Sequence, residues 1–159
     1  MGVLEKLSQF VVGGTAAASH AATDALRQCY VEAVRQARQL ARHAEMAPQP
    51  YSSEGLKELA AAEERHAEAL REALRTADIA LPAIGAERPP TGALSHWARL
   101  VQDLEAHRAS VRRLRELAIH FADTQPTSAA LFDELCRDEA LHCGRLRELI
   151  ARADPQALD

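Results

Sequence analysis

The chain has 159 residues and a mass of 17.3 kDa, a size that suits one domain with a sizeable core. Its net charge of -4 and its pI near 6.0 exclude the broadly basic surface that binding to nucleic acid needs. Aromatic residues make up only 4% of the chain, while alanine and leucine are abundant and β-branched residues are sparse. This composition predicts an all-α protein.

No apolar run approaches the roughly 20 residues that a membrane span needs, and the N-terminal residues lack the charged start of a secretory signal. We therefore expect a cytoplasmic protein with no membrane partner. The three cysteines, Cys29, Cys136 and Cys143, are an odd number without a C-x-x-C pair, which argues against a disulfide scaffold. We expect them to pack as buried thiols, with a redox or soft-metal role as the alternative.

Five helical segments are expected along the chain. Residues 1–14 form a short amphipathic helix that ends at a Gly-Gly hinge, and residues 15–46 have helical spacing of apolar positions without proline or glycine. The next helix is capped by Ser52 or Ser53 and runs to about Leu81, before Pro82. Two further helices cover residues 93–123 and 128–153. We expect residues 15–154 to form one four-helix bundle and residues 155–159 a tail.

The connection at residues 82–92 contains three prolines and two glycines, so it is not helical. Fully extended, it spans about 40 Å, nearly the length of a 28-residue helix. The chain can therefore cross from one end of a bundle to the other between two helical hairpins.

One four-residue pattern occurs twice, as Glu63-x-x-His66 and Glu139-x-x-His142. Positions i and i+3 share a helix face, so each pattern presents a carboxylate and an imidazole on the same side. Each pattern also lies within the apolar stripe of its helix, which predicts that both point into the core.

Four ionisable groups in one core need a partner that compensates for their burial. A pair of divalent metal ions is such a partner. Glu-x-x-His also occurs on solvated helices, where it has no such role, but two copies on two core stripes favour a metal centre.

These residues resemble the ferritin-like superfamily of di-iron carboxylate proteins, especially its bacterioferritin and rubrerythrin branch, over about residues 19–153. The segment from Arg137 to His142 is similar to the bacterioferritin site on helix 4, and the segment from Asp103 to His107 is similar to its helix 3. The resemblance implies a bundle of two helical hairpins in which helices 1 and 3 each add a Glu to the two Glu-x-x-His pairs.

The chain departs from this family pattern on helices 1 and 3. On helix 3 the Glu of the family falls on His107, which lies on the apolar stripe, whereas Glu105 lies about 160° around the helix from it. On helix 1 the carboxylate at a suitable level is Glu32, at the edge of the stripe, so this residue is a ligand or the site is asymmetric. The expected metal ligands are Glu63, His66, Glu139, His142, His107 and Glu32, with Asp103 and Glu105 as further candidates.

Haem and a large shell are not expected. The haem-binding Met of bacterioferritins directly follows the helix-2 Glu, and here that position is Glu64. Almost no chain remains after helix 4 for the fifth helix of ferritin cages, so a homodimer is expected rather than a 24-subunit shell.

The resemblance implies two metal ions, iron first with Mn or Zn as alternatives, and O2 or peroxide as the reactant. Iron oxidation or peroxide detoxification is the expected activity. Two other classes stay open: a metal-binding or storage protein without turnover, and a metal-free helical interaction module. His20, His43, His96 and His120 lie off the stripes or near helix ends and are assigned no role.

Overall fold

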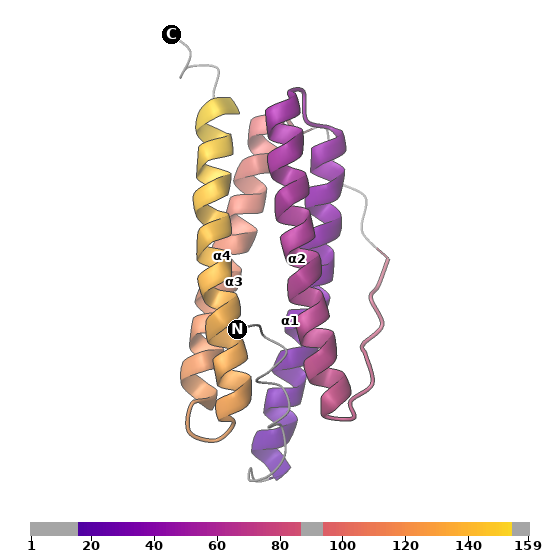
Figure 1. Cartoon of the computed structure of the whole chain (residues 1–159), viewed down its shortest axis with the longest axis vertical. Coiled ribbons are helices and arrows are strands. Elements are labelled where there is room, and N and C mark those ends of the chain that lie inside the picture. Colours follow the sequence, from indigo (N-terminus) through magenta and orange to yellow (C-terminus); the bar gives the residue numbers. More distant parts are fainter. Residues whose placement is uncertain (1–15, 87–93, 154–159) are drawn as a thin grey trace.

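The computed structural model describes residues 16–86 and 94–153, so the expected N-terminal helix and the C-terminal tail lie outside the described residues. The four helices are α1 (Ala16–Glu45), α2 (Pro50–Thr76), α3 (His96–Phe121) and α4 (Pro126–Ala153). The described ranges contain no strand, and the all-α four-helix bundle is confirmed (Figure 1).

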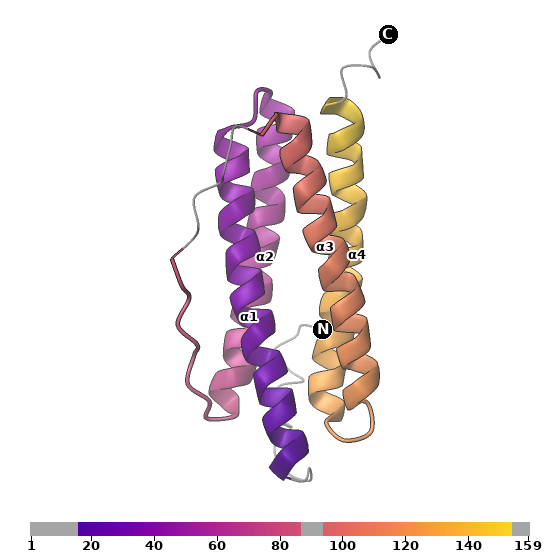
Figure 2. The same ribbon diagram turned by 180° about the vertical axis from the view of Figure 1, so that it is seen from behind.

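The bundle consists of two tight hairpins. Helix α1 packs along α2 and α3 packs along α4, whereas the α1–α3 and α2–α4 seams between the hairpins have far fewer contacts. Figures 1 and 2 show the two pairs separating toward one end of the bundle. Side chains at the two seams therefore have more room than side chains inside either hairpin.

The apolar core is divided into two clusters by a polar layer at mid-height. One cluster includes Leu70 and Phe132, and the other includes Leu56 and Leu146. Between them each helix contributes buried polar side chains: Gln36 on α1, Glu63 and His66 on α2, His107 and Ser110 on α3, and Glu139 and His142 on α4. The apolar clusters on both sides keep this layer away from bulk water.

Helix α2 begins and ends earlier than the sequence predicted. It begins at Pro50 rather than after Ser52 or Ser53. Proline suits the first position of a helix, because its φ is already helical and the N–H it lacks would have no partner there. It ends at Thr76 rather than near Leu81 because Asp78 adopts a left-handed conformation with φ of 55°.

Two backbone hydrogen bonds close this end of α2. The Ile79 amide donates to the Leu74 carbonyl at 2.9 Å, and the Asp78 amide donates to the Arg75 carbonyl at 3.0 Å. This is a Schellman arrangement, and the contact of Ile79 with the apolar core accompanies it. Asp78 adopts the left-handed conformation that glycine usually adopts at the end of a helix, so the sequence did not indicate that α2 ends here.

The connection after α2 is the crossover that the sequence allowed. Helix α3 begins beside the end of α1, where the Arg99 guanidinium donates to the Met46 carbonyl at 3.2 Å. Since α2 ends at the opposite end of the bundle, the chain travels the length of the bundle between α2 and α3 (Figure 2). Trp97 is 44% exposed because it lies in the first turn of α3, at the end of the bundle.

Two leucines of α4 test the assignment of the core. Leu146 is 0% exposed and Leu141 is 72% exposed. We expect Leu146→Ala to lower the free energy of unfolding by about 2–5 kcal/mol through the cavity it leaves, and Leu141→Ala to change it by about 0.5 kcal/mol or less. Urea denaturation of both variants measures the difference, and equal losses would contradict this packing.

Candidate metal centre

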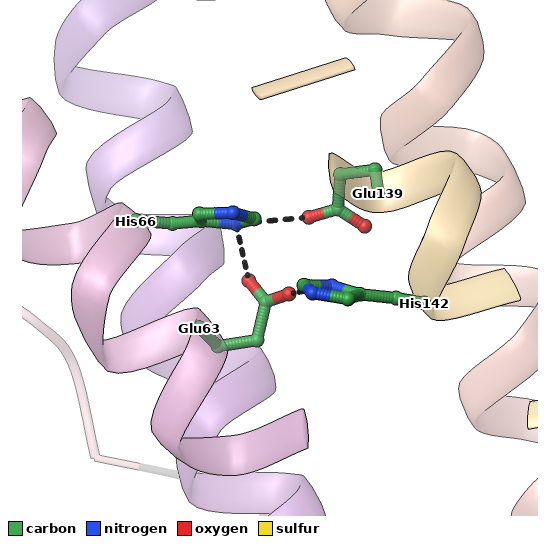
Figure 3. Close-up of side chains that lie close together, drawn as sticks. All are labelled: Glu63, His66, Glu139 and His142. Carbon is green, nitrogen blue, oxygen red and sulfur yellow. Dashed lines mark hydrogen bonds and ion pairs between the residues drawn. The ribbon is translucent and has the colours of Figure 1, made fainter. Parts of the chain in front are cut away.

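Helices α2 and α4 bring the two Glu-x-x-His pairs face to face in the polar layer (Figure 3). One ligand atom from each of Glu63, His66, Glu139 and His142 lies within 4.8 Å of the others. The His142 Nδ1 lies 2.9 Å from the Glu63 Oε1. The His66 Nδ1 lies 3.5 Å from the Glu63 Oε2 and 3.6 Å from the Glu139 Oε1. The expectation that both pairs point into the core agrees with this arrangement.

Helix α3 adds a third imidazole. The His107 Nδ1 donates to the Glu139 Oε2 at 2.6 Å and lies 3.7 Å from the Glu63 Oε1. The rings of His66 and His142 are stacked with centroids 5.2 Å apart, and His107 meets His142 edge-on at 5.6 Å. The Nδ1 atoms of three histidines therefore face two carboxylates.

The carboxylate of Glu63 is ionised, and the pKa values of His66 and His107 are raised so that these two rings favour their protonated forms. Burial would raise the pKa of Glu63, but hydrogen bonds from His142 and His66 lower it to about 2. Burial would lower the pKa of His66, but hydrogen bonds to Glu139 and Glu63 raise it to about 10. The pKa of His107 is also raised, against the effect of burial, by its hydrogen bond to Glu139. Protonated imidazoles thus compensate the buried negative charge.

The residues present fit a metal. The Glu63 Oε2 is buried, and its polar neighbour is the His66 Nδ1 at the long distance of 3.5 Å, which leaves this oxygen open to a closer cation. Carboxylate oxygens and imidazole nitrogens together form a donor set for Fe, Mn or Zn. Any metal must displace the protons that the imidazoles carry at Nδ1.

Three other candidate ligands lie outside the group of four. Glu105 is exposed and pairs with Arg108 at 2.6 Å. The Glu32 carboxylate, 33% exposed, pairs with Arg113 at 2.8 Å. Asp103 is buried, but its two oxygens accept hydrogen bonds from His43 at 2.7 Å and from Gln39 at 2.6 Å.

Two residues of the site were missed at the sequence level. Asp138, 52% exposed, accepts from the His66 Nε2 at 3.4 Å, on the side of the ring away from the carboxylates. Gln36 of α1 is 9% exposed and donates to the Ser110 hydroxyl at 2.9 Å, in the layer where a helix-1 ligand was expected. Its helical spacing from Cys29 and Ala33 was the available signal, because those positions share the inward face.

The three cysteines are free and buried, as expected for packing residues. Burial raises the pKa of Cys29 to about 12, so this thiol is neutral at physiological pH. Cys29 lines a cavity of about 20 Å³ that His66 and Glu139 also line, which is room for about one water molecule.

Comparisons with known proteins identify the fold. No family model matches the chain, and no curated protein matches it. BfrA from M. tuberculosis superposes with a TM-score of 0.70 at 18% identity, covering 85% of this chain and 93% of its own. The bacterioferritin-related protein from Bacteroides fragilis, described as a dodecameric thioferritin, gives 0.75 at 16% identity, with 98% of both chains covered. The chain therefore has the ferritin-like fold. Separately, none of the helices described here is long and apolar enough to cross a membrane.

The pKa values of the centre predict how the metal-free protein responds to pH. The contribution of Glu63 is complete above its ordinary pKa of 4.5 and is lost as the pH falls toward about 2. The contribution of His66 is complete below its ordinary pKa of 6.5 and is lost as the pH rises toward about 10. We expect the free energy of unfolding, measured with urea after chelation, to be highest between these two ordinary values and to fall at alkaline pH. A His66→Gln variant that showed the same alkaline loss would contradict this account.

Proposed function

We propose that this chain is a dinuclear metal protein that holds two metal ions, iron in the first place, between α2 and α4. The observation that carries the proposal is the pair of buried Glu-x-x-His patterns that meet across the core, with one ligand atom from each of the four residues within 4.8 Å of the others. When bound, the metal pair supplies the electrons and the open coordination positions needed to reduce O2 or peroxide. Iron oxidation or peroxide detoxification is the activity that this chemistry supports best.

The side chains have distinct roles in this proposal. Glu63 and Glu139 face the histidine rings, and in this proposal they would be shared between the two metals. His66, His142 and His107 give their Nδ1 atoms, since these face the carboxylates. Asp138 accepts from the His66 Nε2, which fixes the orientation and tautomer of that ring once Nδ1 is deprotonated.

Glu32 can join the ligands only by leaving Arg113. Its carboxylate lines the small cavity beside His66 and Glu139, but it is held by Arg113 at 2.8 Å and by the Ser110 hydroxyl at 3.4 Å. We propose that a rotamer change, with the loss of this ion pair, accompanies any ligation by Glu32.

The third imidazole supports a second candidate function. His107 stands where the family pattern has a carboxylate, so the site has one negative charge fewer and favours lower oxidation states or a metal other than iron. A protein that binds or stores Mn or Zn without turnover has the same ligands. Elemental analysis of protein purified without added metal separates the two functions.

We also propose self-association through the α1–α2 face. A groove there is lined by small or apolar residues, including Tyr30, Val34 and Ala37, and by two acidic and two basic side chains, Glu64, Glu68, Arg38 and Arg71. Such a mixed surface is self-complementary in charge when a second copy packs on it about a twofold axis. The B. fragilis protein is described as a dodecamer, and a homodimer is the smallest assembly that this face supports.

Metal binding should stabilise the folded protein. We expect Co(II) or Fe(II), added without oxygen, to bind at two ions per chain and to raise the melting temperature by mass action on the folded state. Glu63→Ala and Glu139→Ala should abolish this rise, whereas Glu64→Ala, on the exposed face beside Glu63, should keep it. A melting temperature unaffected by both metal and chelation would rule out the proposed function.

Helix α3 offers a matched pair of variants. His107 is 1% exposed and contacts Glu139, while Glu105 is exposed and pairs with Arg108. We expect His107→Ala to weaken metal binding by about 10-fold to 100-fold and Glu105→Ala to leave it nearly unchanged, as measured by equilibrium dialysis. The reverse ranking would mean that α3 turns its carboxylate to the metal.

A further inference from the structure

Two grooves approach the centre from opposite sides of the bundle. The few contacts between the hairpins leave one groove along the α2–α4 seam, on the side facing the viewer in Figure 1, and another along the α1–α3 seam, on the side seen in Figure 2. Their linings carry opposite charge, so a cation meets a different field on each side.

The α2–α4 groove reaches the ligands directly. His66 and His142, 7% and 9% exposed, form part of its wall. Apart from the two histidines, its charged lining residues are Arg65, Glu134 and Asp138, which sum to a formal charge of one negative unit. The Asp138 carboxylate is 52% exposed and lies 3.4 Å from the His66 Nε2, so it connects solvent with a ring of the centre.

The α1–α3 groove is basic. Its charged lining residues are Arg27, Arg35, Arg113 and Glu32, which sum to two positive units. Arg113 and Glu32 also line the small cavity beside His66 and Glu139, so the guanidinium of Arg113 stands between this groove and the centre. Its bonds to Glu32 and Gln28 hold it there. A divalent cation arriving on this side meets net repulsion at the groove.

We propose that metal cations reach the centre through the α2–α4 groove, with Glu134 as the outer carboxylate and Asp138 as the last carboxylate before the histidine rings, and that the α1–α3 groove excludes them. The inference rests on the proposed metal site and adds the direction of entry. Charges that line an entry path raise the local concentration of a cation and its association rate, an effect that salt screens.

The test measures the rate at which Co(II) binds to the metal-free protein, by stopped-flow absorbance at low ionic strength, so that no turnover is needed. Glu134→Gln should slow association and Arg65→Gln should accelerate it, each by about twofold to fivefold. The matched control is Arg35→Gln, an exposed arginine of the other groove, which should leave the rate unchanged. Neither Glu134, Arg65 nor Arg35 belongs to the proposed ligands, so the two ions per chain should be retained.

Each outcome of this experiment supports or overturns the proposed entry route. An Arg35→Gln variant that binds faster, with Glu134→Gln unaffected, would show entry through the α1–α3 groove and overturn the proposal. Equal changes in all three variants, or differences that persist in high salt, would overturn local steering. A wild-type protein that binds no Co(II) would remove the metal centre itself, whereas normal binding at identical rates in every variant would remove only the entry route.

Discussion

The burial of the Glu63 carboxylate is the constraint on which the rest of the centre depends. This side chain is 0% exposed, and an ionised carboxylate in such a place is costly unless cations surround it. In the metal-free protein, His66 and His107 provide positive charge beside it and His142 provides a hydrogen bond at 2.9 Å, so the Nδ1 atoms of all three histidines converge on the carboxylates. The same convergence brings imidazole nitrogens and carboxylate oxygens close together. The side chains that compensate the buried charge are therefore also suited to bind a metal ion.

The polar layer is stabilised by the packing of the apolar residues above and below it. Apolar clusters above and below it, built around residues such as Phe132 and Leu146, supply the burial that holds four helices together. They also shield the layer from bulk water above and below, which strengthens the charge interactions inside it. In the proposed function, metal ions would replace the protons of the imidazole rings as the positive charges beside the carboxylates, and part of the binding free energy would appear as folding stability.

Much of this could be read from the sequence, because helical periodicity alone decides which side chains of one helix face inward. The stripes through Glu63 and Glu139 predicted the facing pairs, and proline and glycine punctuation predicted the two hairpins and the crossover between them. The sequence could not provide the contacts between helices, because these depend on the rotation of each helix about its axis and on its position along the bundle. The pairing of Glu32 with Arg113 and that of His43 with Asp103 both cross from α1 to α3, and no local pattern encodes them. The end of α2 was predicted wrongly for a different reason, because Asp78 adopts a left-handed conformation that glycine usually signals.

Helices α1 and α3 contribute no carboxylate to the polar layer, and this affects the charge balance of a centre that holds metal ions. Two carboxylates set against two divalent ions leave two positive charges uncompensated, and oxidation of the metals would increase that excess. The layer offers no further carboxylate, since α3 contributes His107 and α1 contributes the neutral Gln36. Outside the layer, Asp138 lies 3.4 Å from the His66 Nε2, and Glu32 lines the small cavity beside His66 but is paired with Arg113 at 2.8 Å. If Glu32 stays with Arg113, the centre stabilises reduced ions and suits holding a metal. If the charge of oxidised ions draws Glu32 away, the ion pair becomes the element that couples oxidation to a change in the α1–α3 seam. In the proposed function, the balance between storage and turnover would therefore depend on the Glu32–Arg113 pair as well as on the two Glu-x-x-His patterns.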